Sequence, residues 1–155
     1  MDSNFRNKIN NFLKTPFDDG SSLKGSPATD EEIKNSENEL NYKFSDDYID
    51  FIKEFGGAYL GVNIHAFNNH SMMSKETVTE ITQDFRKAYK GRSTQKLMDE
   101  SLVIAIDGSG NPILISSDGK VIIIYHDSED DIEVLANSFN EFIIKIIDKE
   151  INDLF

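Results

Sequence analysis

Apolar positions recur at helical spacing near the start of the chain. Phe5, Ile9, Phe12 and Leu13 lie on one side of a helix, which predicts a first helix that begins after an N-cap at Ser3 and ends before a proline. The next stretch, residues 18–28, is rich in Gly, Ser, Asp and Pro and predicts a loop. The chain therefore opens with one short amphipathic helix followed by an irregular segment.

Cap signals mark three further helices. Thr29 and Ser138 each precede a Glu by three residues, which is the pattern of a capping box, and Ser45 is an N-cap candidate for a helix between them. Glycines at 56–57 end that middle helix, because glycine adopts the left-handed backbone conformation at low cost. The apolar faces of the three helices contain Ile33 and Leu40; Tyr48, Phe51, Ile52 and Phe55; and Phe139, Phe142, Ile143, Ile146, Ile147 and Ile151.

The strongest β pattern lies in the second half of the chain. Residues 102–107, 112–116 and 121–126 are β-branched runs joined by two tight turns, which predicts an antiparallel meander. Before it, residues 58–67 are predicted to be extended, 74–90 helical and 91–100 irregular. No repeat, linker or low-complexity tract divides the sequence, so residues 1–155 are predicted to form a single α+β domain with a largely antiparallel sheet and flanking helices.

Charge narrows the classes of function. The 155 residues include 16 Lys and Arg against 28 Asp and Glu, which gives a net charge of −12. This balance argues against direct binding of nucleic acid or of anionic membranes, because both need clustered cations. The chain has no cysteine, which excludes disulfides and thiol chemistry. It shows neither a bilayer-spanning apolar run nor a secretion signal, so we expect a cytoplasmic protein.

Candidate catalytic and metal-binding residues are sparse. Asp107, Ser109, Asn111 and Asp118 have calcium-loop spacing, but Pro112 replaces the glycine such a loop needs, so β-turns are the better interpretation. The three histidines lack the spacing of a zinc site on a helix. We interpret His126 as a strand-end residue with a hydrogen-bonded ring, and His65 and His70 as polar surface. No nucleophile elbow or phosphate-binding loop is present, so we expect no enzymatic activity, cofactor or metal.

Two acidic groups remain as candidate partner-binding residues. One lies in the helix that follows Ser45, and the other lies in a loop after the third strand. Such a concentration of carboxylates steers a basic partner toward the surface, although it also serves plain solubility. The cations of residues 86–96 form a contrary basic patch, either an anion site or a solvated helix end. The helix group is Asp46, Asp47, Asp50 and Glu54; the loop group is Asp127, Glu129, Asp130, Asp131 and Glu133.

Two blocks of the sequence resemble a known family. The first runs from Thr29 to Gly57 and includes Asp-Asp-Tyr at 46–48 and the closing Gly-Gly; the second runs from Asp107 to Phe142 and includes Asp-Gly-Ser-Gly-Asn and Ser-Phe-Asn-Glu-Phe. Together they are similar to the SUKH superfamily, the Smi/Knr-like proteins, over residues 28–147. The chain departs from the family pattern at Ser45, where proline is usual, and at Phe55-Gly56-Gly57, where the usual Asn-Gly-Gly is altered.

The resemblance implies a single α+β domain with no shared catalytic residues. It implies an immunity protein that binds a cognate toxin, a basic RNase or DNase domain of an LXG-type or other polymorphic system. Carboxylates suit that partner because they mimic the phosphates that nucleases bind. Two alternatives stay open at this point: a non-catalytic regulatory or scaffold module, and a small hydrolase or ligand binder with a pocket beside His126. The sequence leaves the oligomeric state open.

Overall fold

Four consecutive strands form the central sheet. The computed structural model describes residues 1–128 and 131–151. The sheet contains β3 (Leu102–Ile106), β4 (Pro112–Ile115), β5 (Val121–Tyr125) and β6 (Asp131–Ala136), in that order and antiparallel throughout. A separate small ribbon pairs β1 (Ala58–Tyr59) with β2 (Asn63–Ile64). The predicted meander and the α+β class are confirmed, and β6 is a fourth strand that the sequence reasoning did not predict.

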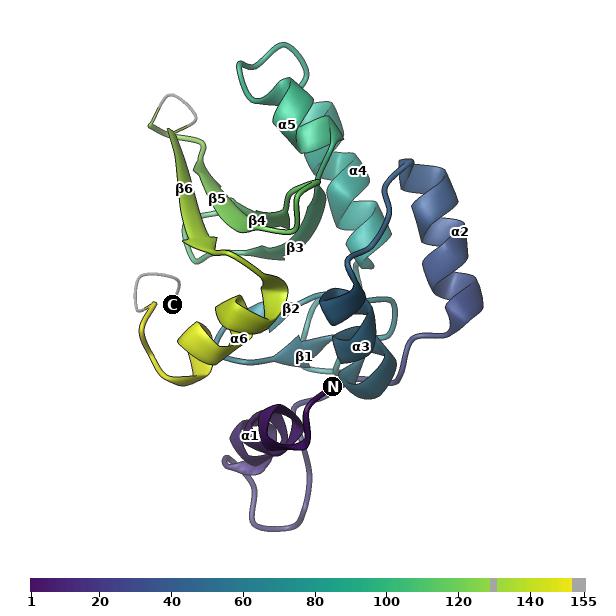
Figure 1. Cartoon of the computed structure of the whole chain (residues 1–155), viewed down its shortest axis with the longest axis vertical. Coiled ribbons are helices and arrows are strands. Elements are labelled where there is room, and N and C mark those ends of the chain that lie inside the picture. Colours follow the sequence, from purple (N-terminus) through teal and green to yellow (C-terminus); the bar gives the residue numbers. More distant parts are fainter. Residues whose placement is uncertain (129–130, 152–155) are drawn as a thin grey trace.

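Both faces of strands β3–β5 are covered, which explains the unbroken apolar runs of these three strands. On one face, Val103, Leu114, Ile122 and Ile124 pack with residues of α4 (Val78–Ala88) and α5 (Gln95–Asp99) in a smaller core. On the other face, β3–β5 contribute to a larger core that includes the other helices. Figure 1 shows α4 beside the sheet and α6 below β6. Strands buried on two sides need apolar residues at every position rather than at alternate ones.

The larger core is centred on aromatic rings from α3 (Asp46–Phe55) and α6 (Phe139–Ile147). Tyr48, Phe51 and Phe139 are fully buried, and the Phe139 ring lies edge-on to both of the others at centroid distances of 5.3 Å. The Tyr48 hydroxyl donates a 2.6 Å hydrogen bond to the His65 carbonyl oxygen. This contact secures α3 to the segment after β2, since a buried hydroxyl needs a partner.

Helix ends follow the predicted caps with several corrections. The capping box of α2 (Asp30–Leu40) is complete, but Ser138 forms only half of the predicted box, because the Glu141 carboxylate accepts from Asn137 instead. The first helix, α1 (Ser3–Lys14), has Asp2 rather than Ser3 as its N-cap. The Ser45 side chain makes no cap hydrogen bond, so a residue without a polar side chain would lose little there. Residues 91–100 contain the short helix α5, which the irregular pattern did not indicate.

Glycines allow three chain segments to cross at one junction. Gly57 accepts a hydrogen bond from the His70 amide, and Gly25 donates one to the Phe55 carbonyl, both at 2.9 Å. A Cβ atom at Gly25 or Gly57 would meet the backbone or side chain of residues 68–69, and Gly56 has φ +60°. Only glycine permits this approach. The junction fixes the loop of residues 20–28 and the segment of residues 65–70 against the end of α3.

Candidate partner-binding surface

The structure uses the acidic residues of α3 in part for internal contacts. Glu54 accepts a hydrogen bond from Arg6 at 2.6 Å and joins α1 to α3. Asp47 accepts from the backbone amide of Asn140 at 3.2 Å, near the N-terminus of α6. Asp50 lies 3.9 Å from the N-terminal ammonium, and its side chain remains 55% exposed. Of the four predicted residues, Asp46 and Asp50 are exposed and the other two are half-buried structural partners.

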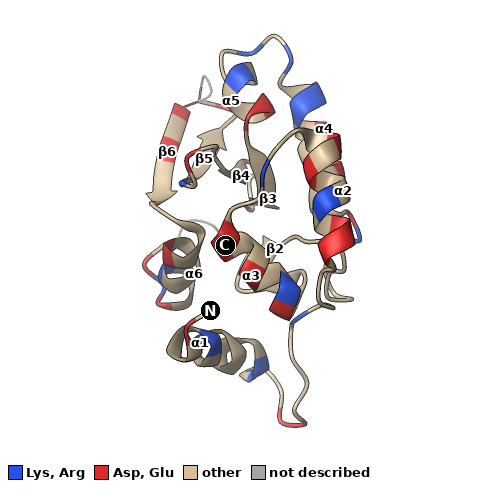
Figure 2. Ribbon diagram, turned by 45° about the vertical axis from the view of Figure 1, so that its right-hand side comes forward, with Lys and Arg blue, Asp and Glu red and all other residues tan. Residues whose placement is uncertain are grey.

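The prediction of an acidic loop after the third strand is wrong in part, because two of its residues lie in a strand. Asp131 and Glu133 belong to β6 and pair across the ladder with Tyr125 and Ile123. Asp127 does precede the strand, in a turn, with a side chain that is 87% exposed. Glu129 and Asp130 lie outside the described residues. Figure 2 shows acidic positions on both β6 and α3.

The two faces of β6 differ in chemistry. Asp131 and Glu133 are exposed on the face that β5 shares with the larger core. The opposite face bears Ile132 and Val134, which are 50% and 52% exposed although their ladder neighbours are buried. The pattern is the alternation of a strand with one polar and one apolar face. The alternation Asp-Ile-Glu-Val is the sequence pattern that indicates this strand, although its acidic residues favoured a loop in the prediction.

The outer edge of β6 is the end of the sheet. β5 occupies one side of β6, and no described residue forms a strand on the other side. At the inner end of the edge, the Lys145 ammonium donates to the Leu135 carbonyl oxygen at 3.2 Å. By contrast, the His65 amide bonds to the Ile104 carbonyl at 2.8 Å beside β3, so the opposite edge is partly covered. Within the described part of the chain, β6 therefore presents a short edge, residues 131–134, that no other strand pairs with.

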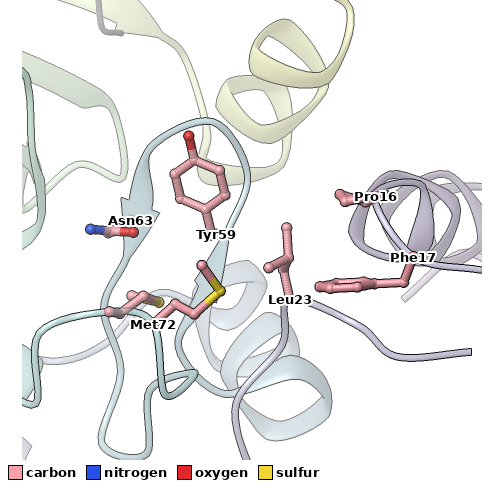
Figure 3. A pocket seen from close by; sticks show the side chains of 7 residues that line it. Pro16, Phe17, Leu23, Tyr59, Asn63 and Met72 are labelled. Atoms are coloured by element: carbon pink, nitrogen blue, oxygen red, sulfur yellow. The ribbon is translucent and has the colours of Figure 1, made fainter. Parts of the chain in front are cut away.

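An apolar pocket lies beside the β1–β2 ribbon. Its volume is about 460 Å³, and Figure 3 shows Phe17, Leu23, Tyr59 and Met72 around it. Met72 is 78% exposed. Among the described residues that line the pocket, only Tyr59 has a titratable side chain, so these residues offer contact area rather than acid–base chemistry. It is not the pocket beside His126 that a hydrolase would have needed.

The histidines do not form a site. His65 is 5% exposed, which corrects the expectation that it belongs to the polar surface, and its burial lowers the pKa of the imidazole. The His126 ring lies 3.3 Å from the Asp127 carboxylate directly after β5, consistent with the predicted strand-end role. Asp107 accepts hydrogen bonds from the Ser109 and Asn111 amides as in a turn. Within residues 1–128 and 131–151, no group of three or more potential ligands is arranged to hold a metal.

The basic segment of α4 and α5 is also partly structural. Arg86 donates to the carbonyls of Leu40 and Ser101, at 2.7 and 3.2 Å, and so ties α4 to the end of α2. Arg92 donates to the His126 carbonyl at 2.9 Å, and its guanidinium lies 4.5 Å from the centre of the Tyr89 ring. The exposed cations that remain are Lys87, Lys90 and Lys96. The arginines of this segment are better explained as structural contacts between neighbouring elements than as an anion-binding site.

Comparison with known proteins defines the class. Residues 27–145 match the SMI1 / KNR4 family (SUKH-1), and the chain belongs to this family. The predicted resemblance is confirmed, including its boundaries to within two residues. Members of the family are commonly immunity proteins and are generally non-catalytic.

One relative comes from a prophage. The SPbeta prophage-derived uncharacterized protein YokK of Bacillus subtilis (strain 168) is 28% identical over 147 residues, covering 79% of this chain and 77% of the relative. Among the described residues, no helix combines the length and the apolar character needed to cross a bilayer.

Proposed function

We propose that this protein is an immunity protein that binds and neutralises one cognate toxin, an RNase or DNase domain of an LXG-type or other polymorphic toxin system. The observation that carries the proposal is family membership across residues 27–145, since members commonly act in this way. The protein acts in the cytoplasm by binding alone. It occludes the active site or substrate groove of the toxin and performs no chemistry on it.

Surface charge supports a nuclease as the partner. Nuclease domains carry cations because they bind phosphates. A chain with a net charge of −12 attracts such a domain from a distance, and carboxylates occupy the positions that phosphates would take. The exposed carboxylates available for this role are Asp46 and Asp50 on α3 and Asp127, Asp131 and Glu133 at β6.

Co-expression with the neighbouring genes tests the proposal. Each open reading frame that flanks the gene is expressed alone and together with this chain, and growth is measured. We expect one neighbour to stop growth when expressed alone and to be tolerated in the presence of the chain. Phe51→Asp is the negative control, because a charge in the fully buried aromatic cluster prevents folding and must abolish protection.

Selectivity is the second part of the test. Discrimination between toxins depends on complementary surfaces, so the chain should protect against its own toxin and fail against unrelated ones. The absence of any toxic neighbour, or equal protection against unrelated toxins, would contradict the proposal. Stable binding to several host regulatory proteins would favour the alternative, a scaffold module.

A further inference from the structure

The open edge of β6 combines three features in one short segment. It ends the sheet, so no strand among the described residues pairs with its outer side, although the Asp131 amide donates a hydrogen bond to the Ser128 carbonyl at 3.2 Å. It exposes Ile132 and Val134 on one face. It exposes Asp131 and Glu133 on the other. Exposed sheet edges template the pairing of a further strand, and many peptide-binding domains use them in this way.

We infer that residues Asp131–Val134 accept a β-strand of the toxin, which joins the sheet as a fifth strand beside β6. The inference rests on the proposed function and specifies how the toxin is recognised. Four residues at about 3.3 Å each give an edge of roughly 13 Å, enough for a short strand. The Lys145–Leu135 hydrogen bond closes the edge at its inner end, so pairing starts at Val134 and runs outward.

The side chains of β6 define the sequence that the incoming strand must have. Directly opposed residues of neighbouring strands share a face. One face of the partner strand must therefore bear Lys or Arg opposite Asp131 and Glu133, and the other must bear apolar residues opposite Ile132 and Val134. The expected partner segment alternates basic and apolar residues, a pattern compatible with a basic nuclease domain.

A second copy of this chain does not satisfy that chemistry. Antiparallel pairing of two β6 strands about a two-fold axis would set Asp131 and Glu133 of one chain against carboxylates of the other on the same face. Like charges in directly opposed positions destabilise a strand pair. The same carboxylates therefore act against self-association and select a partner of opposite charge.

A peptide experiment tests strand addition without the toxin. The probe is a capped Lys-Val-Lys-Val-Lys-Val hexapeptide, titrated into the ¹⁵N-labelled full chain and followed by amide chemical shifts. We expect the shifts to concentrate at residues 131–134 and along β5. Two control peptides separate backbone pairing from charge: Glu-Val repeats, and the Lys-Val peptide with every backbone amide N-methylated. Neither should bind at the edge. Equal binding of the N-methylated peptide, or shifts centred on α3, would overturn the inference.

Two variants with the same change in net charge extend the test. Glu133→Lys reverses a charge at the edge, and Asp46→Lys reverses one on α3, so each alters the total by +2. We expect Glu133→Lys to weaken binding of the peptide, and of the toxin found by co-expression, at least tenfold. Asp46→Lys should change both less than twofold. Circular dichroism and thermal melting verify that both variants are folded.

The outcomes separate the two proposals. A toxin that wild type and Glu133→Lys neutralise equally well overturns the edge inference and leaves the proposed function intact. Peptide pairing at β6 without any toxic neighbour supports a strand-accepting edge and contradicts the proposed function. A wild-type dimer in solution that buries residues 131–134 would overturn the assignment of the partner, because the edge would then serve a second copy.

Discussion

The acidic side chains of α3 and those of β6 carry the same charge in different surroundings. On α3, Glu54 is paired with Arg6 and Asp47 with a backbone amide of α6, so these carboxylates hold neighbouring elements in place. On β6, Asp131 and Glu133 project from a sheet edge, and only a 2.6 Å hydrogen bond from the Tyr125 hydroxyl to Glu133 engages them within the described residues. Carboxylates that cluster in the sequence therefore divide into structural and available groups according to neighbours that lie far away along the chain.

The largest expected difference between α3 and β6 is in how much the loss of an apolar side chain lowers the free energy of unfolding. Phe51→Ala on α3 removes a fully buried ring that contacts Phe139, and we expect it to lower the free energy of unfolding by about 3–5 kcal/mol. Ile132→Ala on β6, half-exposed in the free protein, should change it by no more than about 0.5 kcal/mol. Urea denaturation followed by circular dichroism measures both. A comparable loss in both variants would show that β6 is part of the stabilising core.

A smaller difference in the free energy of unfolding is expected between acidic residues of α3 and of β6. Asp47→Ala removes the acceptor for the Asn140 amide near the start of α6, and we expect a loss of about 1 kcal/mol. Asp131→Ala removes no such contact and should be neutral to within about 0.5 kcal/mol. Thermal melting of the two variants beside wild type checks the order. If Asp131→Ala were the more destabilising, the assignment of structural and available carboxylates would be reversed.

The smallest effect concerns the ion pair between α1 and α3. Arg6 and Glu54 are both partly exposed, so we expect Glu54→Gln to cost less than about 1 kcal/mol. Salt should reduce that cost, because the Debye length falls to about 3 Å at 1 M ionic strength. A double-mutant cycle with Arg6→Gln isolates the pair. A coupling energy well above this range, unchanged in 1 M salt, would mean that the pair is shielded from solvent.

Much of the fold could be predicted because helices and inner strands leave strong local signals. The Thr29 capping box, the Gly56-Gly57 stop and the three β-branched runs are each confirmed within a few residues. The fourth strand escaped prediction because four of its six residues are exposed and two of those are acids. A half-buried edge strand contains few apolar residues. The acidic residues of 131–134 therefore favoured a loop over the strand that the alternation of polar and apolar residues indicates.

The candidate surface was predictable only in outline. Residue types indicate that carboxylates are abundant, but no local pattern reveals that Arg6 reaches Glu54 across 48 positions or that Asp47 meets α6. The burial of His65 was missed for the same reason, since its partners come from α3 and from residue 76. Long-range packing decides which polar side chains remain free, and a single sequence does not encode that packing in any short window.

The glycine junction also bears on how such a protein can change over evolutionary time. At Gly25 and Gly57 any larger residue collides with residues 68–69, so substitutions there should be rejected whatever the partner. Residues 131–134 meet no comparable constraint, because their side chains point to solvent. The chain thus separates positions that cannot vary from positions that can. On the proposed function, substitutions at residues 131–134 can therefore change which toxin is bound while the glycine junction stays the same.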